Sequence, residues 1–351
     1  MKIKSLKFSL YLLTIVAVFV SCNNDDDNTV TFQERDRTEQ QDADKTDWLE
    51  YFTGHYYNSG FFETGSDHKY SDIIITERET DGNGNFLDVP VGHTLLLDAI
   101  ETKFTTYLDV DYEYYILRIN QGNGEAPKFT DAVRARYEGI SIDGEDPFDT
   151  AITPIDLLLT GNGFTTFGVI RGWQLILPTF NSASGFSIDG GGIVNFNNYG
   201  LGIMFVPSGL GYFSAGTTGS TYDNLIFKFE LLQVQEIDHD GDGLPSYVED
   251  LDGNIEVEND NTDDDDFANF IDADDDDDGV STLNELVPTE YIINTNIGEE
   301  EPVLGANEYE RSRSDNSGII TINTVTIADD NDDGTPDYLD ENITINYNED
   351  N

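Results

Sequence analysis

Apolar and polar residues follow several distinct patterns along the chain, and the first is a short apolar run near the amino terminus. Three lysines within the first seven residues precede 13 mostly apolar residues at positions 8–20. A helix of this length is too short to cross a bilayer core of about 30 Å, but it has the length of the apolar part of a secretory signal. The pattern predicts a signal peptide over residues 1–21.

Polar and charged residues dominate positions 22–47, where no apolar period is sustained, and this composition predicts a flexible acidic tether. From position 47 onwards a short amphipathic helix is expected, because four apolar residues recur at roughly helical spacing: Trp48, Leu49, Phe52 and Tyr56. The remainder of residues 48–109 contains short apolar stretches around a turn. We predict that it is an amino-terminal extension packed on a neighbouring domain.

The middle of the chain shows a period of two. Apolar side chains alternate with two arginines over residues 133–137, and residues 225–231 carry apolar side chains at the odd positions opposite Lys228 and Glu230. Half-buried antiparallel strands produce this alternation. We therefore expect an antiparallel sheet in the region that begins near residue 110 and ends near residue 235.

Charge is distributed unevenly over the 351 residues. The chain has 70 acidic and 17 basic residues, a formal net charge of -53, and from Glu236 to the end there are 37 acidic and 2 basic residues, or -35 of that total. Nucleic-acid binding by phosphate neutralisation is excluded, because it requires a basic surface. With 38% hydrophobic residues, a folded core is expected before residue 236, and a cation-binding or disordered segment after it.

Four blocks of the central region resemble the FKBP-type peptidyl-prolyl cis-trans isomerases, in the order that this family has them. The blocks are VRARYEGISIDGEDPFDT (133–150), FTTFGVIRGWQLIL (164–177), VPSGLGY (206–212) and LIFKFELLQV (225–234). The resemblance implies an α+β fold over residues 110–235, in which a twisted antiparallel sheet wraps around one short helix.

The resemblance also implies an apolar pocket that binds proline-containing polypeptides. Trp173 is expected at its floor, and the backbone N–H of Ile170 is expected to hold a substrate carbonyl group. The walls and polar contacts would come from Tyr137, Phe148, Asp149, Val169, Ile170, Tyr212 and Phe227. Such a pocket needs no nucleophile, cofactor or metal, since the reaction is rotation about an X-Pro bond.

Two departures from the family pattern keep a second interpretation open. An insert at residues 182–202 lengthens the connection after Trp173, and the loop before residue 225 has Gly219 near the place where the family has Ile-Pro. Taken without the resemblance, the aromatic residues of these strands would more often be ordinary core residues. The alternative to an enzyme is a non-catalytic binding or adhesion module with the same fold.

The only cysteine, Cys22, follows Ser21 directly after the apolar run, and this arrangement resembles a bacterial lipoprotein signal. The resemblance implies that Cys22 is lipidated and that lipid anchors the protein in the cell envelope, at the outer membrane, on the periplasmic or the surface-exposed side. An ordinary secretory peptide with a coincidental cysteine is the alternative.

The acidic last third, residues 236–351, contains three copies of a twelve-position calcium-loop pattern. Each copy has oxygen-bearing side chains at positions 1, 3, 5 and 12 and glycine at position 6: Asp238, Asp240, Asp242 and Glu249; Asp274, Asp276, Asp278 and Glu285; Asp329, Asn331, Asp333 and Asp340. A degenerate copy has Asn261, Asp263, Asp265 and Asp272. The phrases GLPSYVED and GTPDYLDEN resemble thrombospondin type 3 calcium repeats. We expect irregular loops that bind Ca²⁺ as a structural ion, with a solvated acidic tail as the alternative.

Overall fold

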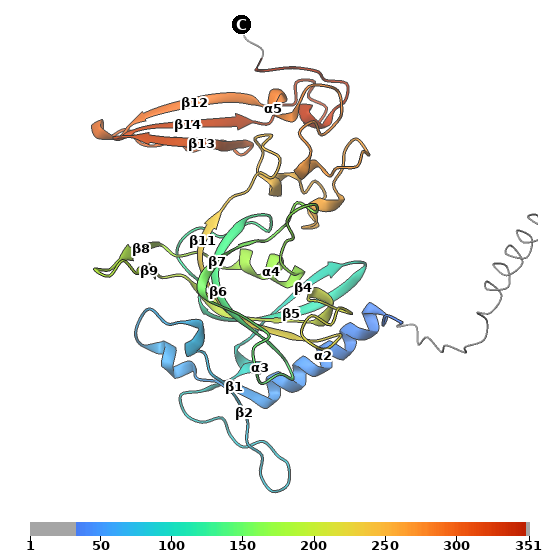
Figure 1. Ribbon diagram of the computed structural model, residues 1–351, viewed down its shortest axis with the longest axis vertical. Coiled ribbons are helices and arrows are strands. Elements are labelled where there is room, and N and C mark those ends of the chain that lie inside the picture. The colour runs from blue at the N-terminus through green and yellow to red at the C-terminus, as the bar shows by residue number, and fades with distance from the viewer. Residues whose placement is uncertain (1–32, 349–351) are drawn as a thin grey trace, which may run out of the picture. The chain divides into compact units, whose positions relative to one another are not determined.

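The computed structural model describes residues 33–348, and its largest element is a six-stranded antiparallel sheet (Figure 1). The strands lie in the order β4 (Glu101–Tyr107), β5 (Val110–Asn120), β10 (Gly200–Val206), β11 (Leu225–Gln235), β6 (Ala132–Ser141) and β7 (Asp149–Leu158). Each strand pairs antiparallel with its neighbours. The described residues from Asp36 onwards belong to one compact unit. The predicted signal peptide, Cys22 and residues 22–32 of the predicted tether fall outside the described residues.

The alternation along the strands buries both faces of this sheet. On β5, Tyr114 and Ile116 join one apolar core, whereas Tyr115 and Leu117 join another. The first core is covered by the short helix α4 (Arg171–Ile176), and the second is covered by α2 (Arg37–Gly54), which runs along the opposite face (Figure 1). The expected arrangement of a mostly antiparallel sheet around a short helix is confirmed.

Helix α2 begins ten residues earlier than predicted, so the assignment of residues 37–47 to a flexible tether is wrong. The Asp36 side chain caps the helix by accepting hydrogen bonds from the backbone N–H groups of Thr38 and Glu39. The first turns bury polar side chains, among them Gln40 and Asp44, so they carry no apolar period that the sequence could reveal. Later residues behave as expected only in part: Trp48 and Phe52 are buried, but Leu49 is 56% exposed and Tyr56 lies in a strand.

Residues 55–100 form a small layer next to α2. They contain a three-stranded sheet of β1 (His55–Tyr57), β2 (Ile75–Glu77) and β3 (Thr94–Leu95), followed by α3 (Leu96–Ala99). Strand β4, however, is paired with β5 along its whole length and belongs to the large sheet. The predicted domain boundary at residue 110 is therefore wrong by one strand, because β4 and β5 form a hairpin that the boundary would cut.

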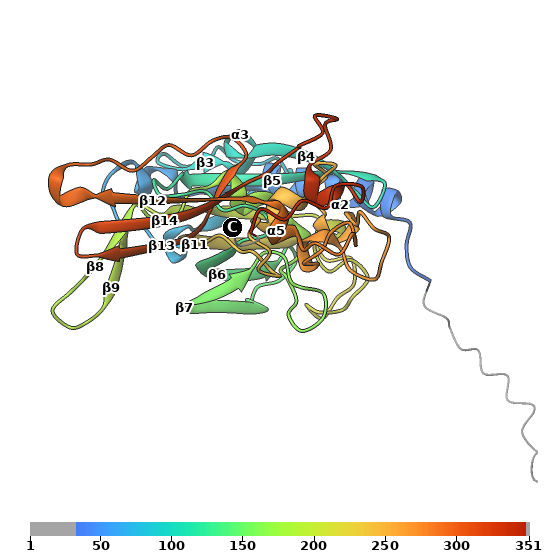
Figure 2. The same cartoon turned by 90° about the horizontal axis from the view of Figure 1, so that it is seen from above.

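The predicted insert forms a β-hairpin that projects from the large sheet (Figures 1 and 2). Its strands are β8 (Gly185–Ile188) and β9 (Val194–Asn197), and residue 200 already starts β10. Three of its apolar side chains are more than half exposed: Phe186, Ile188 and Ile193.

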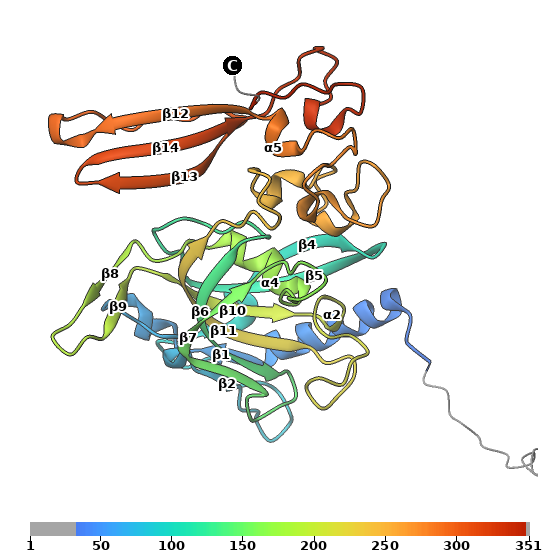
Figure 3. The same ribbon diagram turned by 45° about the horizontal axis from the view of Figure 1, so that its top comes forward.

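The acidic last third is more regular than the predicted run of loops. After α5 (Thr282–Glu285), a three-stranded antiparallel sheet has the order β12 (Val287–Asn294), β14 (Ile319–Thr326) and β13 (Glu308–Asn316) (Figure 3). β13 has the sequence EYERSRSDN and lacks apolar alternation, so its pairing with β14 determines it.

Candidate functional site

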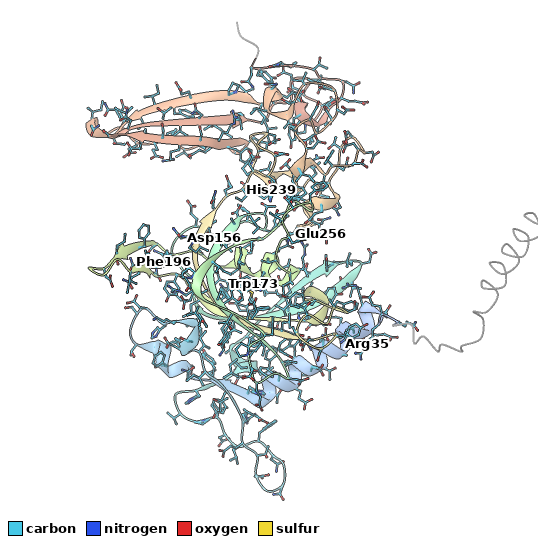
Figure 4. The ribbon with its side chains drawn as sticks, in the orientation of Figure 1. Arg35, Asp156, Trp173, Phe196, His239 and Glu256 are labelled. Atoms are coloured by element: carbon cyan, nitrogen blue, oxygen red, sulfur yellow. The ribbon has the colours of Figure 1, made fainter. Side chains whose placement is uncertain are left out.

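The first candidate site is an aromatic cluster between α4 and the sheet. The rings of Tyr137 on β6 and Phe227 on β11 pack edge-on against Trp173 of α4, with ring centroids 5.0 and 5.3 Å away. Trp173 is only 3% exposed, and Figure 4 shows it on the helix that the large sheet surrounds. Close packing of this kind depends on Gly139, where a Cβ atom would lie 2.6 Å from the Phe227 ring.

Phe148, Asp149 and Tyr212 extend the cluster toward solvent. The Phe148 ring contacts those of Phe227 and Tyr212 at 5.7 and 6.4 Å. The Tyr137 hydroxyl donates a hydrogen bond of 2.6 Å to Asp149 Oδ2, and burial, followed by this bond, raises the pKa of Tyr137. Asp149 itself is exposed at the start of β7. A carboxylate is thus held at the edge of an apolar surface.

Val169 and Ile170 complete the site at the amino-terminal end of α4. Both are half-buried and pack against the same core, and Ile170 occupies the position before the first helical residue. Among residues 33–348, no acceptor pairs with the Ile170 backbone N–H. A groove of about 600 Å³ is lined by Val169, Ile170 and Tyr212, and by Glu256 on its other side. The structure therefore brings all eight predicted pocket residues into one region.

This arrangement can bind an apolar group next to a carbonyl group. The aromatic rings offer an apolar surface, and the free N–H of Ile170 offers one hydrogen-bond donor beside it. Asp149 adds one acceptor with a fixed orientation.

The second candidate site is the loop that starts at Asp238. Asp238 accepts hydrogen bonds from the backbone N–H groups of Gly241 and Gly243, at 2.6 and 3.1 Å, so its carboxylate closes the loop. Asp242 uses Oδ1 to accept from Leu244, and its Oδ2 is buried without a partner. Both carboxylate oxygens of Glu249 are likewise buried and unpartnered, and this side chain is fully buried.

The loop that starts at Asp274 has the same construction. Oxygens of Asp274, Asp276 and Asp278 lie within 4.8 Å of one another, and each of these residues has one buried oxygen without a partner. Glu285 at position 12 is 1% exposed, and neither of its oxygens has a partner. Burial, and then the neighbouring carboxylates, raise the pKa of Glu285 to about 9.

In the third predicted loop, hydrogen bonds from an amide side chain hold the acidic residues together. Asn331 Nδ2 donates hydrogen bonds to Asp333 and Asp340, at 3.1 and 3.0 Å, and Asp329 accepts from the backbone of Gly334. Within the described part of the chain, this loop does not bring three acidic residues into one group. The degenerate copy does, through Asp263, Asp265 and Asp272.

The calcium-loop pattern did not predict two further sets of acidic residues. Asp275, at position 2 of its own loop, reaches Asp242 and Glu249 of the loop that starts at Asp238. Burial, and then the charges of Asp242 and Asp240, raise the pKa of Asp275 to about 9. Asp250, Asp252 and Asp260 form a further group. The pattern contained no signal for Asp275, because position 2 is not a ligand position.

Calcium fits these groups by the chemistry of their donors. Buried carboxylates that lie together without basic partners repel one another, and burial of an ionised carboxylate is costly unless a cation compensates it. Oxygen-only donor sets suit hard cations such as Ca²⁺.

Comparison with known proteins gives three further observations. A segment that covers 33% of the chain is 32% identical, over 118 residues, to "FKBP-type peptidyl-prolyl cis-trans isomerase FkpA" of Escherichia coli K12, and proteins with the same name from strains CFT073 and O157:H7 match equally. This segment covers 36% of those relatives, so the chain spans about a third of their length. Residues 239–302 match a family model described as BamM C-terminal.

Two solved structures are also similar to part of the chain. One is a peptidyl-prolyl cis-trans isomerase from Pseudomonas syringae pv. tomato, with 22% identity and a TM-score of 0.27 over 35% of this chain and 76% of the other. The second is FkpA from Escherichia coli, with 27% identity and a TM-score of 0.28 over 38% of this chain and 53% of the other. The 118-residue sequence match shows that part of this chain is similar to FKBP-type isomerases. No described helix has the length and apolarity required to cross a membrane.

Proposed function

We propose that this protein is a peptidyl-prolyl cis-trans isomerase of the cell envelope that accelerates rotation about X-Pro bonds in exported proteins. The observation that carries the proposal is that the aromatic cluster, with Asp149 at its edge, adjoins through Tyr212 a groove that is also lined by Ile170, whose N–H is free. The similarity of a third of the chain to FKBP-type isomerases supports it.

The proposed mechanism follows from amide chemistry. Rotation of an amide bond has a barrier of about 18–20 kcal/mol, because resonance is lost in the twisted state. The twisted amide is less polar than the planar one, so an apolar surface over Trp173 favours it. The Ile170 N–H would hold the carbonyl group of the substrate, while Asp149, oriented by Tyr137, would accept a hydrogen bond from the peptide. No cofactor takes part.

An isomerisation assay of the full chain on a prolyl peptide tests this proposal. The matched variants are Tyr137→Phe and Tyr115→Phe, since the two tyrosines lie on opposite faces of the sheet and each donates to a carboxylate. Loss of a hydrogen bond to a charged group costs about 1.5–3 kcal/mol, so Tyr137→Phe should lower kcat/KM about tenfold or more, whereas Tyr115→Phe should not. If the folded wild-type chain does not accelerate isomerisation of the peptide, the proposed enzymatic function is refuted.

One observation favours the alternative, a non-catalytic binding module. The β8–β9 hairpin presents Phe186 and Ile193 to solvent at 56% and 62% exposure, next to a cavity that also contains Pro154 and the two arginines of β6. If the chain binds peptide through this hairpin and lacks isomerase activity, then Phe186→Ser with Ile193→Ser should abolish peptide binding.

We further propose that the loops at Asp238 and Asp274 bind Ca²⁺ as a structural ion. Their buried, unpartnered carboxylate oxygens support this assignment. Titration with Ca²⁺ should change the circular dichroism of the full chain, and the same spectrum in chelator and in millimolar Ca²⁺ would reject the metal.

The lipid anchor at Cys22 also remains a proposal, since it lies outside the described residues. Membrane association of this protein would then depend on lipid at Cys22. The Cys22→Ser variant should leave the detergent phase in a partitioning experiment, and its retention there would contradict the anchor.

A further inference from the structure

The loop of residues 250–260 repeats the backbone of the calcium loops that precede and follow it. In the loops that start at Asp238 and Asp274, the residues at positions 4 and 6 have positive φ: Gly241 (83°), Gly243 (104°), Asp277 (52°) and Gly279 (95°). Counted from Asp250, the same positions are Gly253 (φ 74°) and Ile255 (φ 67°). Ile255 N–H donates to Asp250 Oδ2 at 2.9 Å, just as Gly243 N–H donates to Asp238 Oδ2. A β-branched residue at positive φ is unfavourable, so its surroundings must hold Ile255 in place.

The oxygen atoms of this loop point to a ligand. Carboxylate oxygens of Asp250, Asp252 and Asp260 lie within 4.8 Å of one another. Asp260 is only 8% exposed, and its Oδ2 has no hydrogen-bond partner. Asp250 Oδ1 and Asn254 Oδ1 are also buried and unpartnered. Three carboxylates in such a space require a cation, and none of the described basic residues forms an ion pair with them.

The same loop supplies the partners of a buried arginine. The Arg171 guanidinium, on a side chain 7% exposed, donates to the backbone carbonyl groups of Ile255 and Asn254, the latter at 3.1 Å. It also lies over the Tyr107 ring at 5.1 Å and pairs with Glu256 at 3.6 Å. Figure 4 labels Glu256 in this loop and Trp173 two residues after Arg171 on α4. Arg171 directly follows Ile170, which lines the groove and whose N–H has no acceptor among the described residues.

We propose that residues 250–260 bind a divalent cation of the Ca²⁺ class through Asp250, Asp252 and Asp260, and that this ion holds the loop carbonyl groups against Arg171 and so sets the Ile170 end of the groove. Nothing in the twelve-position pattern indicates this site, because isoleucine occupies position 6 and the last acid stands at position 11. The second half of the proposal rests on the proposed isomerase function, and the first half does not.

The physical basis of the coupling is that one loop contacts charged groups on both of its sides, the three carboxylates on one side and the Arg171 guanidinium on the other. The ion offsets repulsion among the three carboxylates on one side, and the carbonyl groups on the other side then satisfy the buried guanidinium. Without the ion, repulsion among the carboxylates opens the loop and allows the Ile255 backbone to leave its unfavourable positive φ. Arg171 loses buried hydrogen-bond partners, and the first turn of α4 can no longer keep one position.

The ion is tested by counting bound Ca²⁺ on the full chain in equilibrium dialysis. The Asp252→Asn/Asp260→Asn variant should bind one ion fewer than wild type, and Asp252→Asn alone, at an exposed position, should weaken one site and keep the fold. The matched control is Asp332→Asn, an exposed aspartate at position 4 of the loop that starts at Asp329, which should bind as many ions as wild type. Equal ion counts in wild type and both test variants would overturn the site.

The coupling is tested by ¹⁹F NMR of chain labelled with 5-fluorotryptophan. The sequence has two tryptophans, so two resonances are expected, and Trp48→Phe assigns them. Ca²⁺ should shift the Trp173 resonance in wild type and in Asp332→Asn but not in the double variant, and Asp252→Asn should require a higher Ca²⁺ concentration for the same shift. A shift that persists in a variant that has lost the ion would overturn the coupling.

Activity provides an independent measurement. If the isomerase function holds, kcat/KM of wild type should differ between Ca²⁺ and chelator by about fivefold or more, the lower range of allosteric couplings, and the double variant should lose this difference. If wild type shows no activity under either condition, the proposed function fails while the ion count and the Trp173 shift still decide the inference.

Discussion

Arg134 and Arg136 lie two residues apart on β6, and each forms an ion pair, but only one pair is buried. Glu230, the partner of Arg136 at 2.8 Å, is completely buried and also accepts the backbone N–H of Tyr70. Arg136→Met would leave this carboxylate without its charge partner, at a cost of about 3–5 kcal/mol in the free energy of unfolding. Arg134→Met, whose partner Asp156 is 65% exposed, should cost about 1 kcal/mol or less. Urea denaturation measures both, and equal effects would refute the importance of burial.

Asp149 is the charged residue at the edge of the aromatic cluster, and its substitution separates charge from shape. Asp149→Asn keeps an acceptor for the Tyr137 hydroxyl but removes the negative charge, so the hydrogen bond weakens. We expect kcat/KM to fall about tenfold, with a change of less than about 1 kcal/mol in unfolding free energy, because Asp149 is exposed. Unchanged activity in the peptide assay would exclude a role of this carboxylate.

At the scale of the element, α2 is attached to the large sheet through a few side chains. Phe52 is 1% exposed and packs against Tyr115 and Phe205, with ring centroids at 4.9 and 5.0 Å. Phe52→Ala should therefore lower the free energy of unfolding by about 3–5 kcal/mol. Leu49→Ala, on the exposed side of the same helix, is the control and should change it by about 0.5 kcal/mol or less. If both variants are equally stable, α2 does not pack on the sheet in solution.

A second contact of α2 should depend on pH. Asp44 is buried and accepts hydrogen bonds from the backbone and hydroxyl groups of Ser208, yet burial outweighs these bonds and raises its pKa to about 6. Because the folded-state pKa lies above the ordinary value, the contribution of Asp44 to stability is complete below about pH 4 and is lost as the pH rises through 6.

The Asp44→Asn variant tests this dependence. It does not titrate, so its stability relative to wild type should improve by about 3 kcal/mol between pH 4 and pH 8. Denaturation curves at the two pH values give the difference, in which the titration of all other groups cancels. Asp42→Asn, at an exposed position on the same helix, is the control. A pH-independent difference for Asp44→Asn would show that this carboxyl is not buried.

At the scale of the whole molecule, the net charge of -53 favours the binding of cations. The acidic last third has only a small apolar core, formed around Leu244, Leu286, Val325 and Tyr338. Chelation of Ca²⁺ should therefore expand this segment, whereas the large sheet, with two extensive cores, should stay folded. A larger hydrodynamic radius in chelator, with unchanged urea unfolding of the sheet, is the expected result, and an unchanged radius would contradict it.

Local patterns in the sequence were sufficient where a structure depends on near neighbours. The period of two predicted β6 and β11, and the spacing of acids around Gly243 and Gly279 predicted loops whose carboxylates do lie together. The pocket residues followed from a family resemblance, and the structure brings them into one region, where aromatic rings pack on Trp173 and three of the residues line a groove. In each case the information lies within about twelve consecutive residues or in matched motifs.

Only the tertiary structure decided the features that depend on distant partners. The start of α2 was hidden because its first turns bury polar side chains, such as Asp44, against a segment 164 residues away. β13 has no apolar alternation and is a strand because it pairs with β14. Arg171 meets the loop of residues 250–260 across 84 residues of sequence. The sequence by itself thus determined the sheet and the ligand-rich loops, since local periodicity encodes them, whereas packing alone decided which of these parts contact one another.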